Sequence, residues 1–203
     1  MLLCDIGNTS YHFLDSKHDY KKSVATFNPQ TIKEKIYYIS VNPKITKILQ
    51  EYENWIDLSK FVEMNNYYDT MGVDRIFACE AVKNAVIVDS GSAITVDVVR
   101  DGIFEGGFIY PGTRAMSETY KNISSALNYP FNYEVDLNKL PKNSIDSISY
   151  GYLKTLQGEV LSHSLDIILT GGDADKLFNI FPSAKIDKNL IFSGMKKILK
   201  EIE

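Results

Sequence analysis

Residues 1–9 read Met-Leu-Leu-Cys-Asp-Ile-Gly-Asn-Thr, and residues 85–93 read Ala-Val-Ile-Val-Asp-Ser-Gly-Ser-Ala. Each stretch has a short apolar run typical of a buried strand, then an aspartate, then a glycine turn with a small polar residue. The aspartates, Asp5 and Asp89, are 84 residues apart. A second apolar segment follows each turn. The repetition predicts two related halves, each opening with a β-hairpin.

Further elements are expected from periodicity, glycine turns and capping residues. After Tyr11–Leu14 and Ile94–Val99, the second strands of the hairpins, we expect strands at 21–27, 36–40, 103–109 and 166–170. Helices are expected at 28–35, 72–84, 112–127, 145–161, 173–180 and 189–202. No Pro/Gly/Ser-rich linker separates the halves, so the predicted domains are 1–84 and 85–203 with an internal joint between them.

Composition narrows the class of protein. The 203 residues carry 22 Lys and Arg against 26 Asp and Glu, a net charge of −4, and 44% of them are hydrophobic. These values are typical of a folded domain and speak against a nucleic-acid-coating protein, which needs a basic surplus. The two cysteines, Cys4 and Cys79, are expected to be buried thiols rather than a disulfide. No stretch resembles a signal peptide or a membrane span, so a cytoplasmic chain without a membrane partner is expected.

The repeated turn has a chemical use. Glycine lets the backbone approach a phosphate closely, and its amide groups together with Asn8, Thr9 or Ser92 donate to phosphate oxygens. The aspartate at the strand end suits a cation that neutralises those phosphates. One such turn is more often an ordinary hairpin, but two are a stronger signal. A third turn, at Gly171-Gly172, follows a strand and favours contact with adenosine over a plain strand-to-helix turn.

This pattern predicts an α/β protein with a duplicated ribonuclease-H-like fold, the fold of sugar kinases, actin and Hsp70-type ATPases. Two halves with mixed sheets would then hold ATP in a cleft between them. The chain has no Gly-x-x-x-x-Gly-Lys-[Ser/Thr] segment, which excludes a P-loop kinase.

A further motif, Gly72-Val73-Asp74-Arg75, makes the resemblance specific. Alone it could be a helix-start aspartate with a solvated arginine. With its neighbours, the sequence resembles the type III pantothenate kinases. The motifs that carry the resemblance are Asp5–Thr9, Gly72–Arg75, Asp89–Thr95, Gly106–Gly112 and Gly171–Ala174, in the order of the family.

The resemblance implies ATP-dependent phosphorylation of pantothenate at its primary hydroxyl to 4'-phosphopantothenate, the first step of coenzyme A biosynthesis. It assigns Asp74 as the general base, and it gives Arg75 the substrate carboxylate or the transferring phosphoryl group. It also implies a homodimer, Mg²⁺ held with ATP at Asp5, and a monovalent cation, K⁺ or NH₄⁺, at Asp89.

The site residues implied by the resemblance fall into two groups. The expected ATP contacts are Asp5, Ile6, Gly7, Asn8, Thr9, Ser10, Tyr11, His12, Ser92, Gly171 and Gly172. The expected pantothenate contacts are Tyr68 (with Tyr67 as the alternative), Gly72, Val73, Asp74, Arg75 and Ser144. The family usually has threonine at Ser92 and often a basic residue at His12, so weaker ATP binding is expected here.

The sequence is also compatible with two other functions. One is a nonenzymatic ATP-binding regulator or actin-like assembly protein on the same fold, for which a substrate base such as Asp74 has no use. The other is a kinase that acts on a different small hydroxylated acid.

Overall fold

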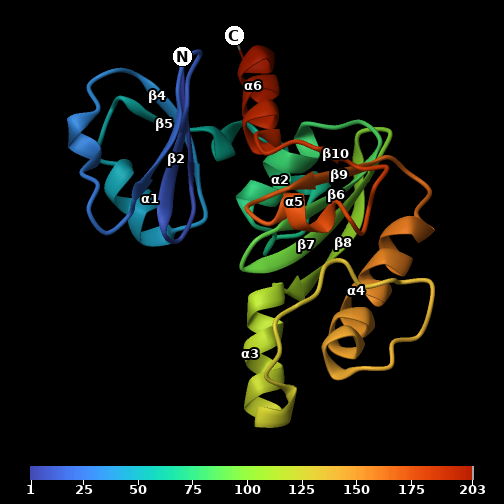
Figure 1. Ribbon diagram of the computed structural model, residues 1–203. Helices are drawn as coiled ribbons and strands as arrows, with labels where there is room; N and C mark the ends of the chain where they lie inside the picture. The colour runs from blue at the N-terminus through green and yellow to red at the C-terminus, as the bar shows by residue number, and fades with distance from the viewer. Residues whose placement is uncertain (203) are drawn as a thin grey trace. The chain divides into compact units, whose positions relative to one another are not determined.

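The computed structural model describes residues 1–202, and its contacts divide the chain into two compact units (Figure 1). The first unit comprises Met1–Val82 and the C-terminal segment from Asn189 onward, and the second comprises Lys83–Lys188. None of the helices within residues 1–202 is long and apolar enough to span a membrane.

Within residues 1–202, the first unit contains a five-stranded sheet, three α-helices and three short 3-10 helices. Its strands are β1 (Leu2–Ile6), β2 (Ser10–Leu14), β3 (Asp19–Ser23), β4 (Ile36–Ser40) and β5 (Trp55–Asp57). Its helices are η1 (Pro29–Thr31), α1 (Pro43–Leu49), η2 (Leu58–Phe61), η3 (Met64–Asn66), α2 (Val73–Glu80) and α6 (Leu190–Ile202).

The second unit contains the other sheet, three α-helices and one 3-10 helix. Its strands are β6 (Ala85–Ser90), β7 (Ala93–Arg100), β8 (Ile103–Pro111), β9 (Ile167–Thr170) and β10 (Lys185–Ile186). Its helices are α3 (Thr113–Ile123), η4 (Ser125–Leu127), α4 (Ser144–Ser162) and α5 (Ala174–Leu177).

The two sheets have the same topology. The first has the order β3-β2-β1-β4-β5 and the second the order β10-β9-β6-β7-β8. In each sheet the first three strands in chain order pair antiparallel, and the last two are added parallel on the other side of the opening strand. The duplicated mixed-sheet fold predicted from the repeat is therefore confirmed.

Each sheet buries its own apolar face. In the first unit, Tyr11, Phe13 and Trp55 form an aromatic cluster with β1 and β4. In the second unit, the alternating valines of β6 and β7 pack against α4, where Leu153 and Leu156 are fully buried. Every second residue of β7, namely Ile94, Val96 and Val98, belongs to this core, as the two-residue period of a strand requires.

The C-terminal helix α6 lies with the first unit, although the sequence placed 189–203 in the second half. It packs on α2 at Gly194, where a Cβ atom would come within 1.8 Å of the Phe77 carbonyl oxygen. Only glycine permits so close an approach between the two backbones. The joint between the units falls at Val82–Lys83, two residues before the predicted boundary.

Several local predictions were wrong in position or extent. The third strand is β3, at Asp19–Ser23 rather than 21–27, because the amides of Thr26 and Phe27 turn back to the Ser23 carbonyl. The helix expected at 28–35 is only the 3-10 turn η1. Asn54 donates to the carbonyls of Ile32 and Glu34, which holds the segment after η1 out of a helix.

The sequence also overestimated three helices and missed a fourth. The helix expected at 112–127 is α3 followed by η4, that at 72–84 ends at Glu80, and that at 173–180 is the single turn of α5. Helix α1 and the short strands β5 and β10 were not predicted. Asn42 caps α1 with its side-chain oxygen on the amides of Lys44 and Ile45, ahead of Pro43 in the first turn.

Candidate active site residues in two units

The first of the turns predicted to bind phosphate joins β1 to β2. The Gly7 amide donates to the Ser10 carbonyl at 3.0 Å, which closes a tight turn with Asn8 and Thr9 exposed at its tip. Asp5 is partly buried on β1, paired with His12 across the hairpin and with Ile39 on β4. The turn therefore presents amide, hydroxyl and carboxamide groups to solvent beside a carboxylate.

Two predicted ATP contacts in this hairpin have side chains in the core. Ile6 is fully buried, and Tyr11 is 1% exposed among Phe13, Phe27 and Trp55. Burial raises the pKa of Tyr11 to about 12. At these two positions only backbone atoms are available to a ligand.

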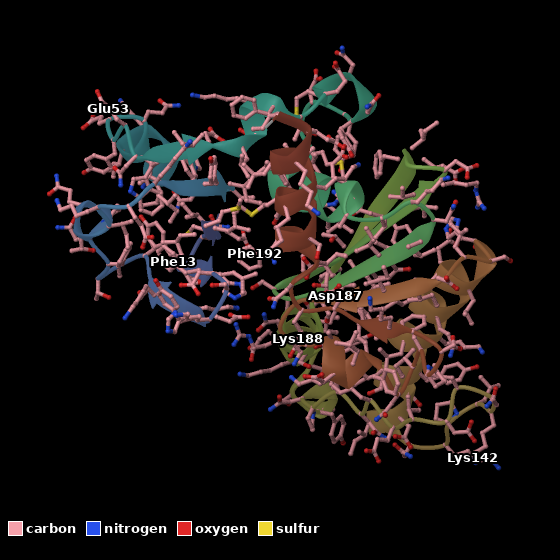
Figure 2. All side chains as sticks on the ribbon, turned by 90° about the horizontal axis from the view of Figure 1, so that it is seen from above. Phe13, Glu53, Lys142, Asp187, Lys188 and Phe192 are labelled. Atoms are coloured by element: carbon pink, nitrogen blue, oxygen red, sulfur yellow. The ribbon has the colours of Figure 1, made fainter. Side chains whose placement is uncertain are left out.

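The side chain of His12 already has partners within the first unit. Its Nε2 lies 2.7 Å from Asp19 Oδ1, and its ring stands edge-on to Phe192 of α6 at 4.8 Å between centroids. Phe192 is labelled in Figure 2. The hydrogen bond from His12 holds the pKa of Asp19 below its usual range. The imidazole thus binds a carboxylate at the position where the family often has a basic residue.

In the second unit, the β6–β7 turn repeats the first. The Gly91 amide donates to the Ala93 carbonyl at 2.9 Å, and Ser92 is exposed at the tip. The Gly112 amide donates to the Ser92 carbonyl at 3.0 Å. A Cβ atom on Gly112 would lie 2.4 Å from the Gly91 carbonyl oxygen, so the start of α3 rests directly on this turn.

The third turn, Gly171-Gly172, lies against the end of β6, next to the β6–β7 turn. Gly171 has φ +85°, and a Cβ atom there would lie 2.2 Å from Asp89 Oδ1 and 2.5 Å from the Ser90 carbonyl oxygen. The Asp173 amide donates to that Ser90 oxygen at 2.9 Å. A side chain at Gly171 would be both strained and obstructed. The structure thus brings together the predicted ATP contacts Ser92, Gly171 and Gly172.

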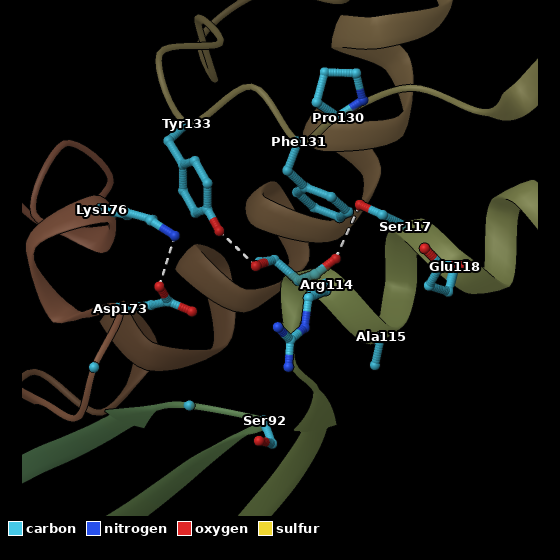
Figure 3. Close-up of a pocket in the computed structure, with 13 residues that line it drawn as sticks. Ser92, Arg114, Ala115, Ser117, Glu118, Pro130, Phe131, Tyr133, Asp173 and Lys176 are labelled. Atoms are coloured by element: carbon cyan, nitrogen blue, oxygen red, sulfur yellow. Dashed lines mark hydrogen bonds and ion pairs between the residues drawn. The ribbon is translucent and has the colours of Figure 1, made fainter.

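These turns border an open pocket of about 740 Å³ (Figure 3). Side chains from α3, α5 and the loop before α4 complete it. Its lining residues are Gly91, Ser92, Thr113, Arg114, Ala115, Ser117, Glu118, Pro130, Phe131, Tyr133, Gly172, Asp173 and Lys176. The volume lies in the range of small-molecule sites.

Several polar side chains of this pocket, unlike Ser92, were not among the predicted site residues. Lys176 pairs with Asp173 at 2.6 Å and lies 5.8 Å from the centroid of the Tyr133 ring, whose hydroxyl bonds Thr113 Oγ1. Figure 3 shows the Arg114 guanidinium extending toward the Ser92 turn, and within residues 1–202 it makes no hydrogen bond or ion pair. Arg114 could have been found because it lies two residues after Gly112, the end of the predicted motif Gly106–Gly112, whereas Tyr133 has no local signal.

Asp74 and Arg75 lie in the first turn of α2. Gly72 is the N-cap, and the Arg75 amide donates to Asp74 Oδ1 at 2.8 Å. A Cβ atom on Gly72 would lie 2.5 Å from that same oxygen, so the glycine leaves room for the carboxylate. Val73 is half-buried beside it. Burial raises the pKa of Asp74 above the usual aspartate value, against the opposing effects of the Arg75 amide and charge.

The two tyrosines before this helix differ in their partners. Arg75 is 7% exposed and donates from Nη1 to the Tyr68 hydroxyl at 2.5 Å. Tyr67 donates instead to Glu80 Oε1 at 2.8 Å, at the far end of α2. Tyr68, with 43% of its surface exposed, is the tyrosine placed beside Arg75.

Ser144 is not brought to the pocket of Figure 3. It is exposed at the start of α4, next to the cap Asn143, and lines a separate hollow of about 460 Å³ with Tyr120 and Lys142.

The neighbourhood of Asp89 is rich in oxygen. Thr95 is its register partner across the β6–β7 pair, so the two side chains share one face of the sheet. Thr95 Oγ1 is buried and has no hydrogen-bond partner within residues 1–202. A carboxylate and an unpaired hydroxyl are suitable ligands for a hard cation.

Comparisons with known proteins agree with one another. A family model described as type III pantothenate kinase matches residues 15–163. A protein of Sulfurimonas denitrificans named type III pantothenate kinase is 55% identical over 201 residues, which cover 99% of this chain and 98% of the relative.

Solved structures support the same fold. A Campylobacter jejuni protein named for a Baf family of transcriptional activators has a TM-score of 0.89 and 39% identity, over 100% of this chain and 98% of its own. A Sinorhizobium meliloti protein named as a 2-dehydro-3-deoxygalactonokinase has a TM-score of 0.61 at 10% identity, over 99% and 98% of the two chains, and supports the sugar-kinase fold alone. With the family model and a full-length relative at 55% identity, the chain belongs to the type III pantothenate kinase family.

Proposed function

We propose that this chain transfers the γ-phosphoryl group of ATP to the primary hydroxyl of pantothenate, giving 4'-phosphopantothenate for coenzyme A biosynthesis. Membership of the family supports the reaction class. The observation that carries the proposal is the Asp74 carboxylate, which is partly buried, lies next to a buried arginine and has a raised pKa.

In the proposed step Asp74 is the general base. The substrate hydroxyl oxygen forms a bond to the γ-phosphorus, its proton passes to an Asp74 carboxylate oxygen, and the bond from the γ-phosphorus to the β–γ bridging oxygen breaks to release ADP. Asp74 then returns the proton to solvent. Because its pKa is raised, the Asp74 carboxylate accepts a proton more readily than an exposed aspartate does. A loose transition state requires mainly that the base orient the hydroxyl and remove its proton late in the reaction.

Arg75 and Tyr68 are proposed to bind pantothenate. The Arg75 guanidinium is a planar donor fork that suits a carboxylate or a phosphoryl group, and the Tyr68 hydroxyl fixes one of its nitrogens. Gly72 and Val73 are assigned to the same substrate through their position beside Asp74. Ser144 keeps this assignment on the resemblance alone.

The ATP phosphates are assigned to the two hairpin turns. In the first unit these are Asp5, Gly7, Asn8, Thr9 and Ser10, and in the second Ser92, with Gly171 and Gly172 against the nucleoside. Amide groups of tight turns and exposed hydroxyls support this role. We add Arg114 to the set, because its guanidinium lies in the pocket of Figure 3 with no hydrogen-bond or ion-pair partner among residues 1–202 and is therefore available to an anion.

Two cations fit the residues present. Asp5 offers a carboxylate for the Mg²⁺ that accompanies ATP, and Asp89 with Thr95 offers oxygen ligands for K⁺ or NH₄⁺. When bound, such ions would supply positive charge that neutralises phosphate oxygens.

We also propose a cytoplasmic homodimer, as the resemblance implies. Exposed apolar side chains of the second unit, namely Ile109, Ile123 and Leu140, would lose solvent contact in a dimer interface. Light scattering that gives a monomer mass at micromolar concentration would count against the dimer.

A coupled assay of ADP release, with and without pantothenate and with and without K⁺, tests the reaction. We expect ADP release that depends on pantothenate and increases with K⁺. ATP hydrolysis that ignores pantothenate would contradict the proposal, and ATP-driven filaments in sedimentation would favour an assembly protein. If ATP is consumed only when another hydroxylated acid is added, that acid and not pantothenate would be the substrate.

A further inference from the structure

The segment that precedes α2 has few apolar anchors. Residues 63–66 and 68–70 are exposed, and Met71, at 6% exposed, is the buried residue that lies nearest to Tyr68 along the chain. A segment with so little buried surface keeps its position mainly through polar contacts. The contacts made by its two adjacent tyrosines therefore decide where Tyr68 lies.

These tyrosines attach the segment to both ends of one helix. Tyr68 accepts from Arg75 in the first turn of α2, and Tyr67 donates to Glu80 at its last residue. An eight-residue helix separates its two ends by about 10 Å. The chain before α2 is thus fixed at two points, of which only the Arg75 end belongs to the proposed substrate site.

The contact at the far end has a third member. Lys197 of α6 lies with Nζ 2.7 Å from Glu80 Oε2, while Tyr67 occupies Oε1 of the same carboxylate. The Glu80 side chain is 16% exposed, so its charge is poorly solvated and benefits from both partners.

The packing of α6 on α2 explains why Lys197 reaches this carboxylate. Gly194 rests on the Phe77 carbonyl, and Lys197 and Glu80 each lie three residues further along their helices. Residues three apart share a helix face. The close approach at Gly194 therefore brings the lysine and the glutamate together one turn later.

We infer that Lys197, Glu80 and Tyr67 form a positioning relay for the substrate site: the C-terminal helix holds Glu80, Glu80 holds Tyr67, and Tyr67 sets the position of Tyr68 against Arg75. This inference rests on the proposed function for its effect on pantothenate. None of the three residues touches the substrate in this scheme. Each acts through the neighbouring tyrosine.

Lys197→Met and Tyr67→Phe test the relay, with Lys196→Met as the matched control, because Lys196 is exposed on the same helix and makes no ion pair within residues 1–202. We expect each of the two test variants to raise KM for pantothenate about fivefold with kcat and KM for ATP unchanged. The double variant should be no worse than either single one, since both break the same relay. Lys197→Arg, which keeps the positive charge, should leave KM for pantothenate at its normal value.

Hydrogen exchange of the full-length chain separates this inference from the proposed function. Amides in 64–71, among them those of Tyr67 and Met71, should exchange about fivefold faster in Lys197→Met and Tyr67→Phe but not in Lys196→Met. Unchanged exchange, an equal effect of Lys196→Met, or a loss of kcat without a change in KM would each overturn the relay. If the unmodified protein fails to phosphorylate pantothenate while the exchange result holds, the proposed function fails and the relay stands.

Discussion

The guanidinium of Arg75 donates to the Tyr68 hydroxyl at 2.5 Å, and its central carbon lies 5.7 Å from the centroid of the same ring. One arginine therefore meets both the polar and the aromatic part of an exposed tyrosine. Such a contact restricts the orientation of the guanidinium more than a hydrogen bond alone would, because the neighbouring ring also limits the orientation of the guanidinium plane.

Tyr68→Phe keeps the ring and removes the hydroxyl. We expect KM for pantothenate to rise about fivefold with little change in kcat, whereas Arg75→Lys should cost more, because a point charge cannot replace the planar fork. Steady-state kinetics at saturating ATP measure both. The control is Tyr37→Phe, which alters a similar pair, with Lys35 Nζ 4.9 Å from its ring, outside the proposed site. A loss of kcat alone in Tyr68→Phe would contradict the binding role.

Asp74 predicts an acid limb in the pH dependence of activity. A general base works only when deprotonated, so kcat/KM should fall as the pH drops through the pKa of Asp74, which burial places above the ordinary aspartate value. Asp74→Asn should abolish turnover and leave the circular dichroism spectrum unchanged. A variant that retains its rate would remove the base assignment.

The same raised pKa has a consequence for stability with the opposite sign. The folded protein binds the Asp74 proton more tightly than the unfolded chain, so this group lowers the free energy of unfolding as pH rises from the usual carboxyl range through the folded pKa, with no further change above it. Asp74→Asn should therefore be more stable than the unmodified protein at pH 7. Urea unfolding at pH 7 measures the difference, and a less stable variant would contradict this reasoning.

Gly72→Ala should separate activity from stability. The new Cβ would meet Asp74 Oδ1 at 2.5 Å, and the carboxylate can rotate away at little cost to the fold. We expect kcat to fall about tenfold or more, since small displacements of a catalytic group are costly. Gly158→Ala is the control, because nothing lies near its Cβ position in α4, and it should raise stability by about 0.5–1 kcal/mol with normal kinetics. Equal kinetics in the two variants would show that Gly72 does not matter to the carboxylate.

Arg114→Met tests the pocket of Figure 3. Removing this guanidinium should raise KM for ATP about tenfold and leave KM for pantothenate unchanged. Lys139→Met, which removes an exposed cation paired with Asp136 away from the pocket, should change neither constant. If the two variants behave alike, Arg114 has no role in binding the nucleotide.

The local motifs were predictable because each is encoded within a few adjacent residues. The two hairpins followed from apolar runs interrupted by Asp-x-Gly. Five of the six strands predicted with bounds matched the structure to within about two residues at either end, as with β4 at Ile36–Ser40. Helix ends were less predictable, because contacts from distant residues decide them. Asn54, for example, binds the carbonyls that would otherwise have continued a helix after η1.

The sequence by itself determined the repeated sheet topology and the family, and it predicted which turns bind phosphate, because all three are written as short motifs in a fixed order. Only the tertiary structure decided that α6 belongs with the first unit, that Gly171 lies against Asp89, and that Arg114, Tyr133 and Lys176 share a pocket. These are contacts between residues far apart in the chain. They depend on close backbone approaches at Gly112, Gly171 and Gly194, and no local pattern shows which part of the chain each glycine meets. His12 shows the same limit: the resemblance predicts an ATP contact at this position, and only the structure shows that its imidazole forms a hydrogen bond with Asp19.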